Sequence, residues 1–162
     1  MYRKNFPKVD GFHAVSKAIK SEVQKYGGSP KKIKVIYSGL NLKNIAFNLK
    51  EFKPNSELKI VSIGRSHWKK GYSYAIDAMS ILEKENYNFH HTIIGADNIE
   101  EYLYKRDGYQ LESHVTFKGN IPFNEVIDQM KNADVVLLSS VEEGIANVVI
   151  EAMALGTIVI AT

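Results

Sequence analysis

A carboxylate in an apolar helix is the first feature of this sequence that suggests chemistry. Residues 142–156, EEGIANVVIEAMALG, predict a helix from residue 146 onward that is apolar on almost every side, with Glu151 in its middle. A buried carboxylate is costly unless a partner satisfies it. Glu143 stands eight positions earlier, so that the spacing is Glu-x7-Glu, and Gly144 next to it lets the backbone pass close to a ligand.

The start of the same helix is a candidate anion site. The backbone N–H groups of Ile145, Ala146 and Asn147 would lie at the helix N-terminus, where unsatisfied donors and the helix dipole favour a phosphate. Glu151, about two turns further on, could accept hydrogen bonds from the hydroxyl groups of a bound ribose. The residues alone leave two alternatives equally open, because Glu151 could pair with a buried lysine or arginine, or be exposed.

A second cluster lies in GRSHWKKG, residues 64–71, directly after a predicted strand. Gly64 allows a sharp turn, and the loop then presents Arg65 and Lys70. The planar fork of arginine and the mobile charge of lysine together suit a diphosphate. Two solvated surface charges would give the same pattern. His67 and Trp68 lie in this loop, and no histidine in the chain has metal-ligand spacing on a helix.

The segments around these motifs predict the scaffold that positions them. Short apolar strands alternate with helices in the second half of the chain, which indicates a parallel sheet covered on both faces. We therefore predict a doubly wound, Rossmann-like α/β fold whose ligand edge follows the strand ends. The predicted strands are 59–64, 89–95, 114–119, 134–140 and 157–162, and the predicted helices are 71–85, 99–112, 123–133 and 146–156.

The first part of the chain is organised differently. Residues 9–41 predict a strand, a helix, a Gly-Gly turn and a second strand, and a polar stretch at 40–57 is typical of a linker. We expect domain boundaries at 1–40, 41–57 and 58–162. The final predicted strand has no helix after it to cover it, so we expect a fragment truncated at both ends.

Composition excludes several classes of protein. The 162 residues contain no cysteine, which excludes disulfides and thiolate metal sites, and a net charge of +3 is too mild to indicate nucleic-acid binding. No apolar run approaches the roughly 20 residues of a membrane helix. These features are typical of a cytoplasmic protein, and peripheral association with the inner face of a membrane stays open.

Taken together, the motifs resemble the retaining glycosyltransferases of family 4, which have the two-domain GT-B architecture. The resemblance covers nearly the whole chain beyond about residue 10. It rests on five segments in order, VSKAIKSEVQKYGGSPKKIKVIYSGLN, VSIGRSHWKKGYSYAIDAM, TIIGADN, VTFKGNIP and NADVVLLSSVEEGIANVVIEAMALGTIVIAT. It implies transfer of a sugar from a nucleotide-diphosphate donor to an acceptor with retained anomeric configuration, with the donor bound by the C-terminal domain seen here.

The resemblance also implies roles for single residues. Arg65 and Lys70 match the pair that neutralises the diphosphate, Glu151 matches the glutamate on the ribose, and Glu143 matches the one that faces the donor sugar. Further matches are with residues that contact the sugar, phosphate or nucleobase: Gly64, Gly144, Ile145, Ala146, Asn147, and Gly119, Asn120 and Ile121 for the base. Where the family often has Phe-Gly, this chain has Ile145 and Ala146, which keeps the backbone accessible.

A mechanism follows as a hypothesis. Arg65, Lys70 and the helix N-terminus would stabilise the charge on the departing diphosphate, so no metal and no cofactor are required. The acceptor would attack on the same face, and Glu143 would orient the donor rather than form a glycosyl-enzyme. The partners implied are a nucleotide-sugar donor, and a sugar or lipid-linked acceptor held by an absent N-terminal domain. Two alternatives are a non-catalytic nucleotide- or sugar-binding module and a GT-B-type sugar-nucleotide epimerase.

Overall fold

The structure is a computed structural model, and it describes residues 2–40, 47, 56–144 and 146–162. The chain divides into two compact units. One consists of Met1–Leu40 with Glu143–Asn147, and the other of Asn41–Glu142 with Val148–Thr162. Each unit is described by itself below. Most of the predicted linker at 41–57 lies outside the described residues, so the predicted domain boundaries stay a prediction.

The smaller unit has one parallel pair of strands joined through a helix. Strands β1 and β2 pair in parallel, and α2 is the connection between them. Ser16 caps α2, because its hydroxyl accepts a hydrogen bond from the backbone N–H of Ile19 at 3.1 Å. The predicted order of strand, helix, turn and strand is confirmed. Its elements are α1 (Tyr2–Asn5), η1 (Phe6–Lys8), β1 (Phe12–Ala14), α2 (Lys17–Lys25), η2 (Pro30–Lys32) and β2 (Ile33–Val35).

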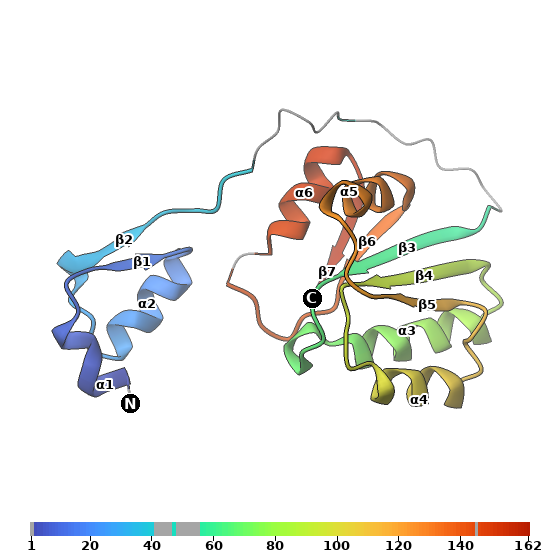
Figure 1. The fold of residues 1–162 in the computed structure, drawn as a ribbon, viewed down its shortest axis with the longest axis horizontal. Coiled ribbons are helices and arrows are strands. Elements are labelled where there is room, and N and C mark those ends of the chain that lie inside the picture. The colour runs from blue at the N-terminus through green and yellow to red at the C-terminus, as the bar shows by residue number, and fades with distance from the viewer. Residues whose placement is uncertain (1, 41–46, 48–55, 145) are drawn as a thin grey trace. The chain divides into compact units, whose positions relative to one another are not determined.

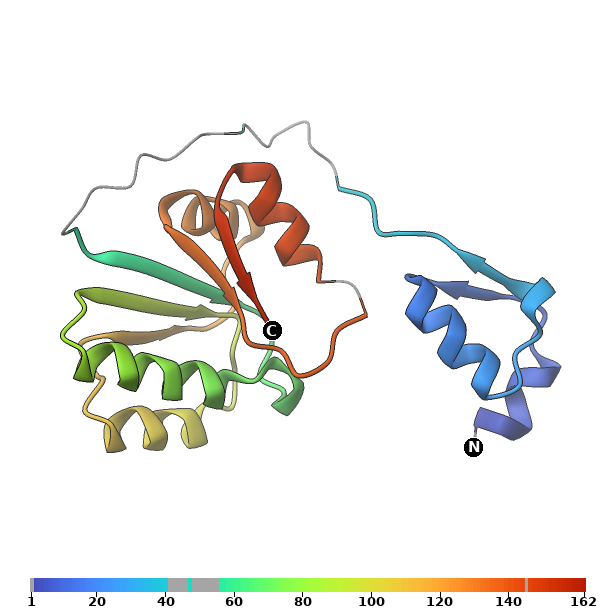
Figure 2. The same ribbon diagram turned by 180° about the vertical axis from the view of Figure 1, so that it is seen from behind.

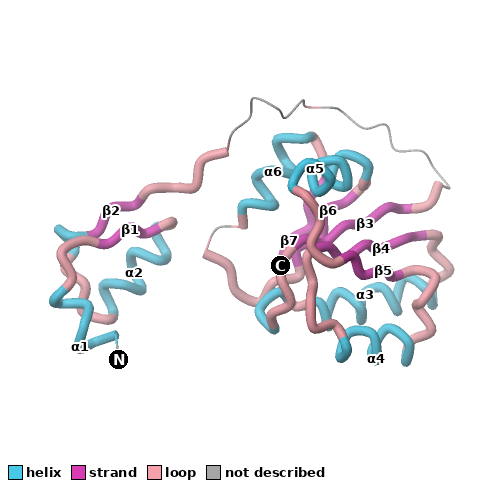
Figure 3. The backbone as a smooth tube through the Cα atoms, viewed as in Figure 1, coloured by secondary structure: helices cyan, strands magenta, loops and turns pink. Residues whose placement is uncertain are grey.

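The larger unit is a five-stranded parallel sheet with the order β5-β4-β3-β6-β7 (Figure 1). The predicted doubly wound α/β fold is therefore confirmed. Strands and helices alternate along the chain, as the colouring by secondary structure shows (Figure 3). Its elements are β3 (Leu58–Ile63), η4 (Trp68–Lys70), α3 (Tyr72–Lys84), β4 (Phe89–Ile94), α4 (Glu100–Gly108), β5 (Val115–Lys118), α5 (Phe123–Asn132), β6 (Val135–Leu138), α6 (Asn147–Leu155) and β7 (Ile158–Ala161).

Two layers of helices enclose the sheet. Helices α3 and α4 lie on one side and α5 and α6 on the other, as both views of the ribbon show (Figures 1 and 2). The core beneath α3 and α4 includes Ile76, Ile93 and Leu111, all fully buried. Burying a side chain of this size contributes about 1.5–3 kcal/mol each, so this layer fixes the position of the strands and of their ends.

The order of the strands predicts where a ligand binds. The chain builds outward from the central strand β3 to β4 and β5, and then crosses over to β6 and β7 on the other side of β3. The strand order thus reverses between β3 and β6. In doubly wound sheets the ligand crevice opens at such a switch point, beyond the carboxyl ends of the two strands. The segments that follow β3 and β6 are therefore the first candidates for a site.

Candidate functional site

Glycines stand at the carboxyl ends of three adjacent strands. Gly64 follows β3, Gly95 follows β4 and Gly119 follows β5. The N–H of Gly64 donates to Ile94 O at 2.9 Å, and a Cβ atom at Gly95 would lie 3.3 Å from Gly64 O. Gly95 also has a φ of +83°, which favours glycine. The backbones approach closely there, and this edge of the sheet carries no side chains at the three positions.

The loop after β3 brings Lys70 back over Gly64. A Cβ atom at Gly64 would lie 2.9 Å from Cε of Lys70 and 3.2 Å from the hydroxyl of Tyr72, which donates to Gly64 O at 2.8 Å. Lys70 is half-buried, whereas Arg65 is exposed. The structure therefore brings together Gly64 and Lys70 at the switch point, and Arg65 follows directly on the same loop.

Contacts with the segment after β6 fix this loop. Gly71 has a φ of +64°, and a Cβ atom there would lie 1.9 Å from Ser139 O. The buried hydroxyl of Ser139 donates to Lys70 O at 3.0 Å, and the N–H of Val141 donates to Lys69 O at 2.7 Å. The two segments on either side of the switch point are thus joined through the backbone of Lys69, Lys70 and Gly71.

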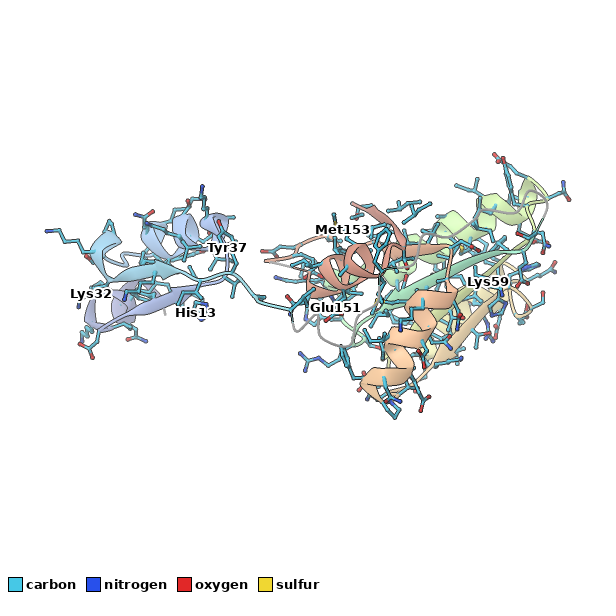
Figure 4. The ribbon with its side chains drawn as sticks, turned by 90° about the horizontal axis from the view of Figure 1, so that it is seen from above. His13, Lys32, Tyr37, Lys59, Glu151 and Met153 are labelled. Carbon is cyan, nitrogen blue, oxygen red and sulfur yellow. The ribbon has the colours of Figure 1, made fainter. Side chains whose placement is uncertain are left out.

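Glu151 lies on α6, away from Met153 on another side of the helix (Figure 4). It is half-buried, and this burial raises the pKa of its carboxyl above the usual value. No hydrogen bond or ion pair joins its side chain to the residues that the structure describes. Glu151 is neither fully exposed nor paired with a described lysine or arginine, so the two alternatives left open by the sequence lose support.

The segment between β6 and α6 belongs in part to the smaller unit. Glu143 is exposed, and a Cβ atom at Gly144 would lie 3.6 Å from Cγ2 of Val15 within that unit. Ala146 is half-buried and Asn147 begins α6. Residue 145 lies outside the described residues. The predicted anion site on the backbone of residues 145–147 and the predicted role of Glu143 therefore stay predictions.

The predicted nucleobase segment follows β5. Gly119 and Asn120 are exposed and Ile121 is half-buried. Gly119 O accepts a hydrogen bond from the N–H of Gly95 at 3.1 Å, and a Cβ atom at Gly119 would meet no atom within 4 Å. This segment thus begins at the same edge of the sheet as the loop that carries Arg65 and Lys70, with open space beside Gly119.

Sequence reasoning missed two contributors to this edge, Ser139 and Glu142. Ser139 is not in a Gly-x-Ser-x-Gly elbow, so its sequence context does not indicate a nucleophile. Its role here is to hold Lys70 in place. Glu142 forms an ion pair with Lys69, with Oε2 2.5 Å from Nζ. Neither contact has a local signal, since residues 69 and 70 meet residues 139–142 only through the pairing of β3 with β6.

A hollow lies elsewhere on the larger unit, away from the strand ends just described. It has a volume of about 150 Å³, and Lys59 and His90 on the sheet and Gln129 and Asn132 of α5 are among the residues that line it. Among the described residues, no group of three or more acidic or histidine side chains is placed to hold a metal ion. The helices described are all too short or too polar to cross a membrane.

Comparison with known proteins identifies the relatives of this chain. The family model described as Glycosyl transferases group 1 matches residues 45–162. An uncharacterized glycosyltransferase of Methanocaldococcus jannaschii is 37% identical over 160 residues, which cover 90% of this chain and 40% of that protein. The amylovoran biosynthesis glycosyltransferase AmsK of Erwinia amylovora is 33% identical over 144 residues, covering 84% of this chain and 35% of that protein.

Solved structures share the fold. The structure of Anabaena Alr3699/HepE in complex with UDP-glucose matches with a TM-score of 0.79 at 22% identity, over 99% of this chain and 49% of that one. Staphylococcus aureus TarM, in a complex with UDP among other ligands, matches with a TM-score of 0.82 at 19% identity, over 98% and 31%. The chain thus spans 35–40% of the length of the two curated relatives cited, and about a third to a half of these two structures.

Proposed function

This chain belongs to the glycosyl transferases group 1 family, and we propose that it forms the donor-binding half of a sugar transferase. In this proposal, the larger unit binds a nucleotide-diphosphate sugar beyond the strand ends of β3, β5 and β6. The complete protein transfers the sugar to an acceptor and retains the anomeric configuration. The smaller unit belongs to the acceptor domain, and residues 41–57 link the two.

One observation carries the proposal. The hydrogen bond from Ser139 fixes the backbone of Lys70, whose side chain lies over Gly64 at the point where the strand order reverses, and the next residue after Gly64 is Arg65. A lysine on a fixed backbone beside a bare backbone edge suits a diphosphate, because less freedom is lost when the anion binds. A solvated surface lysine would need neither the hydrogen bond from Ser139 nor the glycine beneath it.

Glu151 supplies the second contact in this proposal. A half-buried carboxylate with a raised pKa and without a described partner gains hydrogen bonds when it accepts from the two hydroxyls of a ribose. Glu143 orients the donor sugar. The segment that begins with Gly119, Asn120 and Ile121 holds the nucleobase, and the backbone around Ile145, Ala146 and Asn147 contacts the sugar and phosphate.

The names of relatives narrow the substrates we propose. Anabaena Alr3699/HepE was solved with UDP-glucose, and AmsK is named for amylovoran biosynthesis. The capsular polysaccharide biosynthesis glycosyltransferase CapH of Staphylococcus aureus is 30% identical over 137 residues, covering 82% of this chain and 37% of that protein. We therefore propose a UDP-hexose donor and an acceptor that is a growing polysaccharide or a lipid-linked sugar.

In the proposed reaction, the bond between the anomeric carbon and the diphosphate oxygen breaks, and the electron pair leaves with the diphosphate. Arg65 and Lys70 stabilise that charge as it develops. The acceptor hydroxyl forms the new bond from the same face, and its proton passes to the departing phosphate oxygen. Glu143 stays non-covalent, so an intact-mass glycosyl adduct on Glu143 would contradict this step.

Calorimetric titration of the chain with UDP, GDP and ADP tests the proposal. We expect saturable binding of UDP and at least tenfold weaker binding in Glu151→Ala, because a hydrogen bond to a charged group contributes about 1.5–3 kcal/mol. Glu112→Ala, at an exposed position elsewhere, is the matched control and should bind like the wild type. A folded wild-type chain that binds none of the three nucleotides would overturn the proposal.

A further inference from the structure

The loop between Arg65 and Lys70 presents an aromatic ring. Trp68 is the only tryptophan in the sequence, and 66% of its surface is exposed. Single exposed aromatic residues are common and need no explanation by themselves. The position of Trp68 within the proposed diphosphate loop, and the groups that surround its ring, distinguish it from the other exposed aromatic residues.

The backbone around Trp68 is held on both sides. The N–H of Lys70 donates to His67 O at 2.8 Å, and the N–H of Gly71 donates to Trp68 O at 3.1 Å. The N–H of Lys69 donates to Nδ1 of His67 at 3.2 Å. The contact between Lys69 O and Val141, described above, ties this short helix to the segment after β6. A ring presented from a fixed backbone loses little freedom when it binds a ligand.

Charged groups border the ring. The ammonium of Lys69 lies over the indole, 5.6 Å from the ring centre, and it pairs with the carboxylate of Glu142 at 2.5 Å. The ring of His67 is also close, with its centre 5.8 Å from that of the indole. The Lys69–Glu142 pair places hydrogen-bond donors and acceptors beside an apolar ring face. A pyranose has the matching chemistry, because its C–H face is attracted to the negative face of an aromatic ring while its hydroxyls point outward.

We propose that the exposed part of Trp68, with the Lys69–Glu142 pair beside it, forms a stacking platform for a pyranose ring of the acceptor. This inference rests on the proposed function of the neighbouring loop. The half-buried Lys70 and the buried Gly71 form the inner side of the loop, where the donor diphosphate binds, whereas Trp68 faces solvent. The acceptor must reach the reacting centre from solvent, so the exposed ring meets the acceptor sugar.

Because Trp68 is the sole tryptophan, its fluorescence reports on this site alone. We expect that methyl glycosides of glucose, galactose, mannose or N-acetylglucosamine, added to the UDP-saturated chain, shift the emission to shorter wavelength in a saturable way. Concentrations up to about 100 mM cover the roughly millimolar Kd that one stacked ring sustains. The absence of any shift with all four sugars would overturn the proposal.

Other ligands of the ring would give different results. A shift with UDP alone, and no further change with the glycosides, would assign Trp68 to the nucleotide. A shift with UDP-glucose but not with any methyl glycoside would assign it to the donor sugar. A shift with vesicles containing about 30% anionic lipid, and with no sugar, would assign it to a membrane surface. Each of these results would contradict the acceptor platform.

Variants distinguish a loss of stacking on Trp68 from a general loss of folding. In calorimetric titrations with the glycoside that gives the largest shift, Trp68→Ala should weaken binding at least tenfold, and Trp68→Phe should recover most of it. Glu142→Gln should weaken binding a few-fold, whereas Glu112→Gln should not. UDP binding should be nearly unchanged in the two Trp68 variants and in Glu112→Gln. If the wild type binds no UDP, the proposed function fails; if UDP binds normally and Trp68→Ala matches the wild type toward glycosides, the platform alone fails.

Discussion

A polar side chain in the interior of the sheet, His91, and one on helix α6, Glu151, differ in their hydrogen-bond partners. In the interior, His91 on β4 is fully buried, and its Nε2 lies 2.9 Å from Oγ of Ser62. The Ser62 hydroxyl donates to Leu137 O at 2.8 Å, so His91 Nε2 must be the donor toward Ser62. Burial, aided by the charge of neighbouring His90, lowers the pKa of His91 to about 3.

On helix α6, Glu151 is half-buried and bonds to no described side chain, and burial raises the pKa of its carboxyl. His91 has a hydrogen-bond partner within the sheet, whereas the Glu151 carboxylate would gain its partners from a ligand. A neutral histidine inside a hydrogen-bonded pair contributes to the stability of one arrangement of strands. A half-buried carboxylate without a described partner costs stability, and a ligand that donates hydrogen bonds to it would recover that cost. The comparison predicts that changes in the interior alter stability and that changes at the edge alter binding.

The largest effect is expected at Gly71, where one substitution should lower both the stability of the fold and the affinity for UDP. In Gly71→Ala the new methyl group would lie 1.9 Å from Ser139 O, with a φ of +64° that disfavours alanine. We expect a loss of about 3 kcal/mol or more in the free energy of unfolding, together with weaker UDP binding. Urea unfolding and calorimetry measure the two effects. Gly108→Ala, where a Cβ atom meets nothing within 4 Å, is the control and should be nearly neutral.

The next largest effect is expected on UDP binding, in a variant of Lys70. Lys70→Met should weaken UDP binding by about 1.5–3 kcal/mol, because one charge-assisted contact is lost. Lys84→Met, at the end of α3, removes the same charge from an exposed position and should leave the Kd unchanged. Equal effects of the two variants would show that only overall charge matters.

The interior should respond to pH. His91 takes up a proton in the unfolded chain below its usual pKa of 6.5 but in the folded chain only near 3. The unfolded state therefore binds more protons in this window, and stability falls as pH falls from 6.5 toward 3. The loss reaches about 2 kcal/mol at pH 5. Denaturation at several pH values should show a flatter profile in His91→Gln, and His90→Gln should retain most of the slope.

The smallest expected effect is at Glu151, where stability changes with pH in the direction opposite to that at His91. Because burial raises the pKa of Glu151 in the folded chain, the folded state binds more protons than the unfolded one just above the usual glutamate pKa. Stability contributed at this position falls as pH rises through that window. Glu151→Gln should therefore stabilise the ligand-free chain by a few tenths of a kcal/mol at pH 7, with the gain vanishing toward pH 4. A destabilised variant at pH 7 would indicate a structural role instead.

The strands and helices could be predicted from the sequence, but the contacts at the carboxyl ends of the strands could be predicted only in part. A strand or helix can be predicted from a short stretch of sequence, because burial on one or two faces dictates which positions are apolar. The strand at residues 89–95 and the amphipathic helix at 123–133 are examples. The contacts that hold Lys70 join residues about seventy positions apart, and no local pattern encodes them. Glu143 and Glu151 stood out by their spacing and by the apolar helix around Glu151, and the resemblance to a family added their expected roles. Ser139 and Glu142 could be found only from the strand order.

An NMR titration of the ¹⁵N-labelled chain with UDP tests the central claim most directly. The account predicts saturable amide shifts at Gly64 and Gly119, at the strand ends, with the shift lost in Lys70→Met. Gly27 and Gly28 in the smaller unit serve as internal references and should not move. Saturable shifts that instead gather at Lys59, His90 and Asn132, around the hollow beside α5, would contradict the assignment of the donor site to the carboxyl edge.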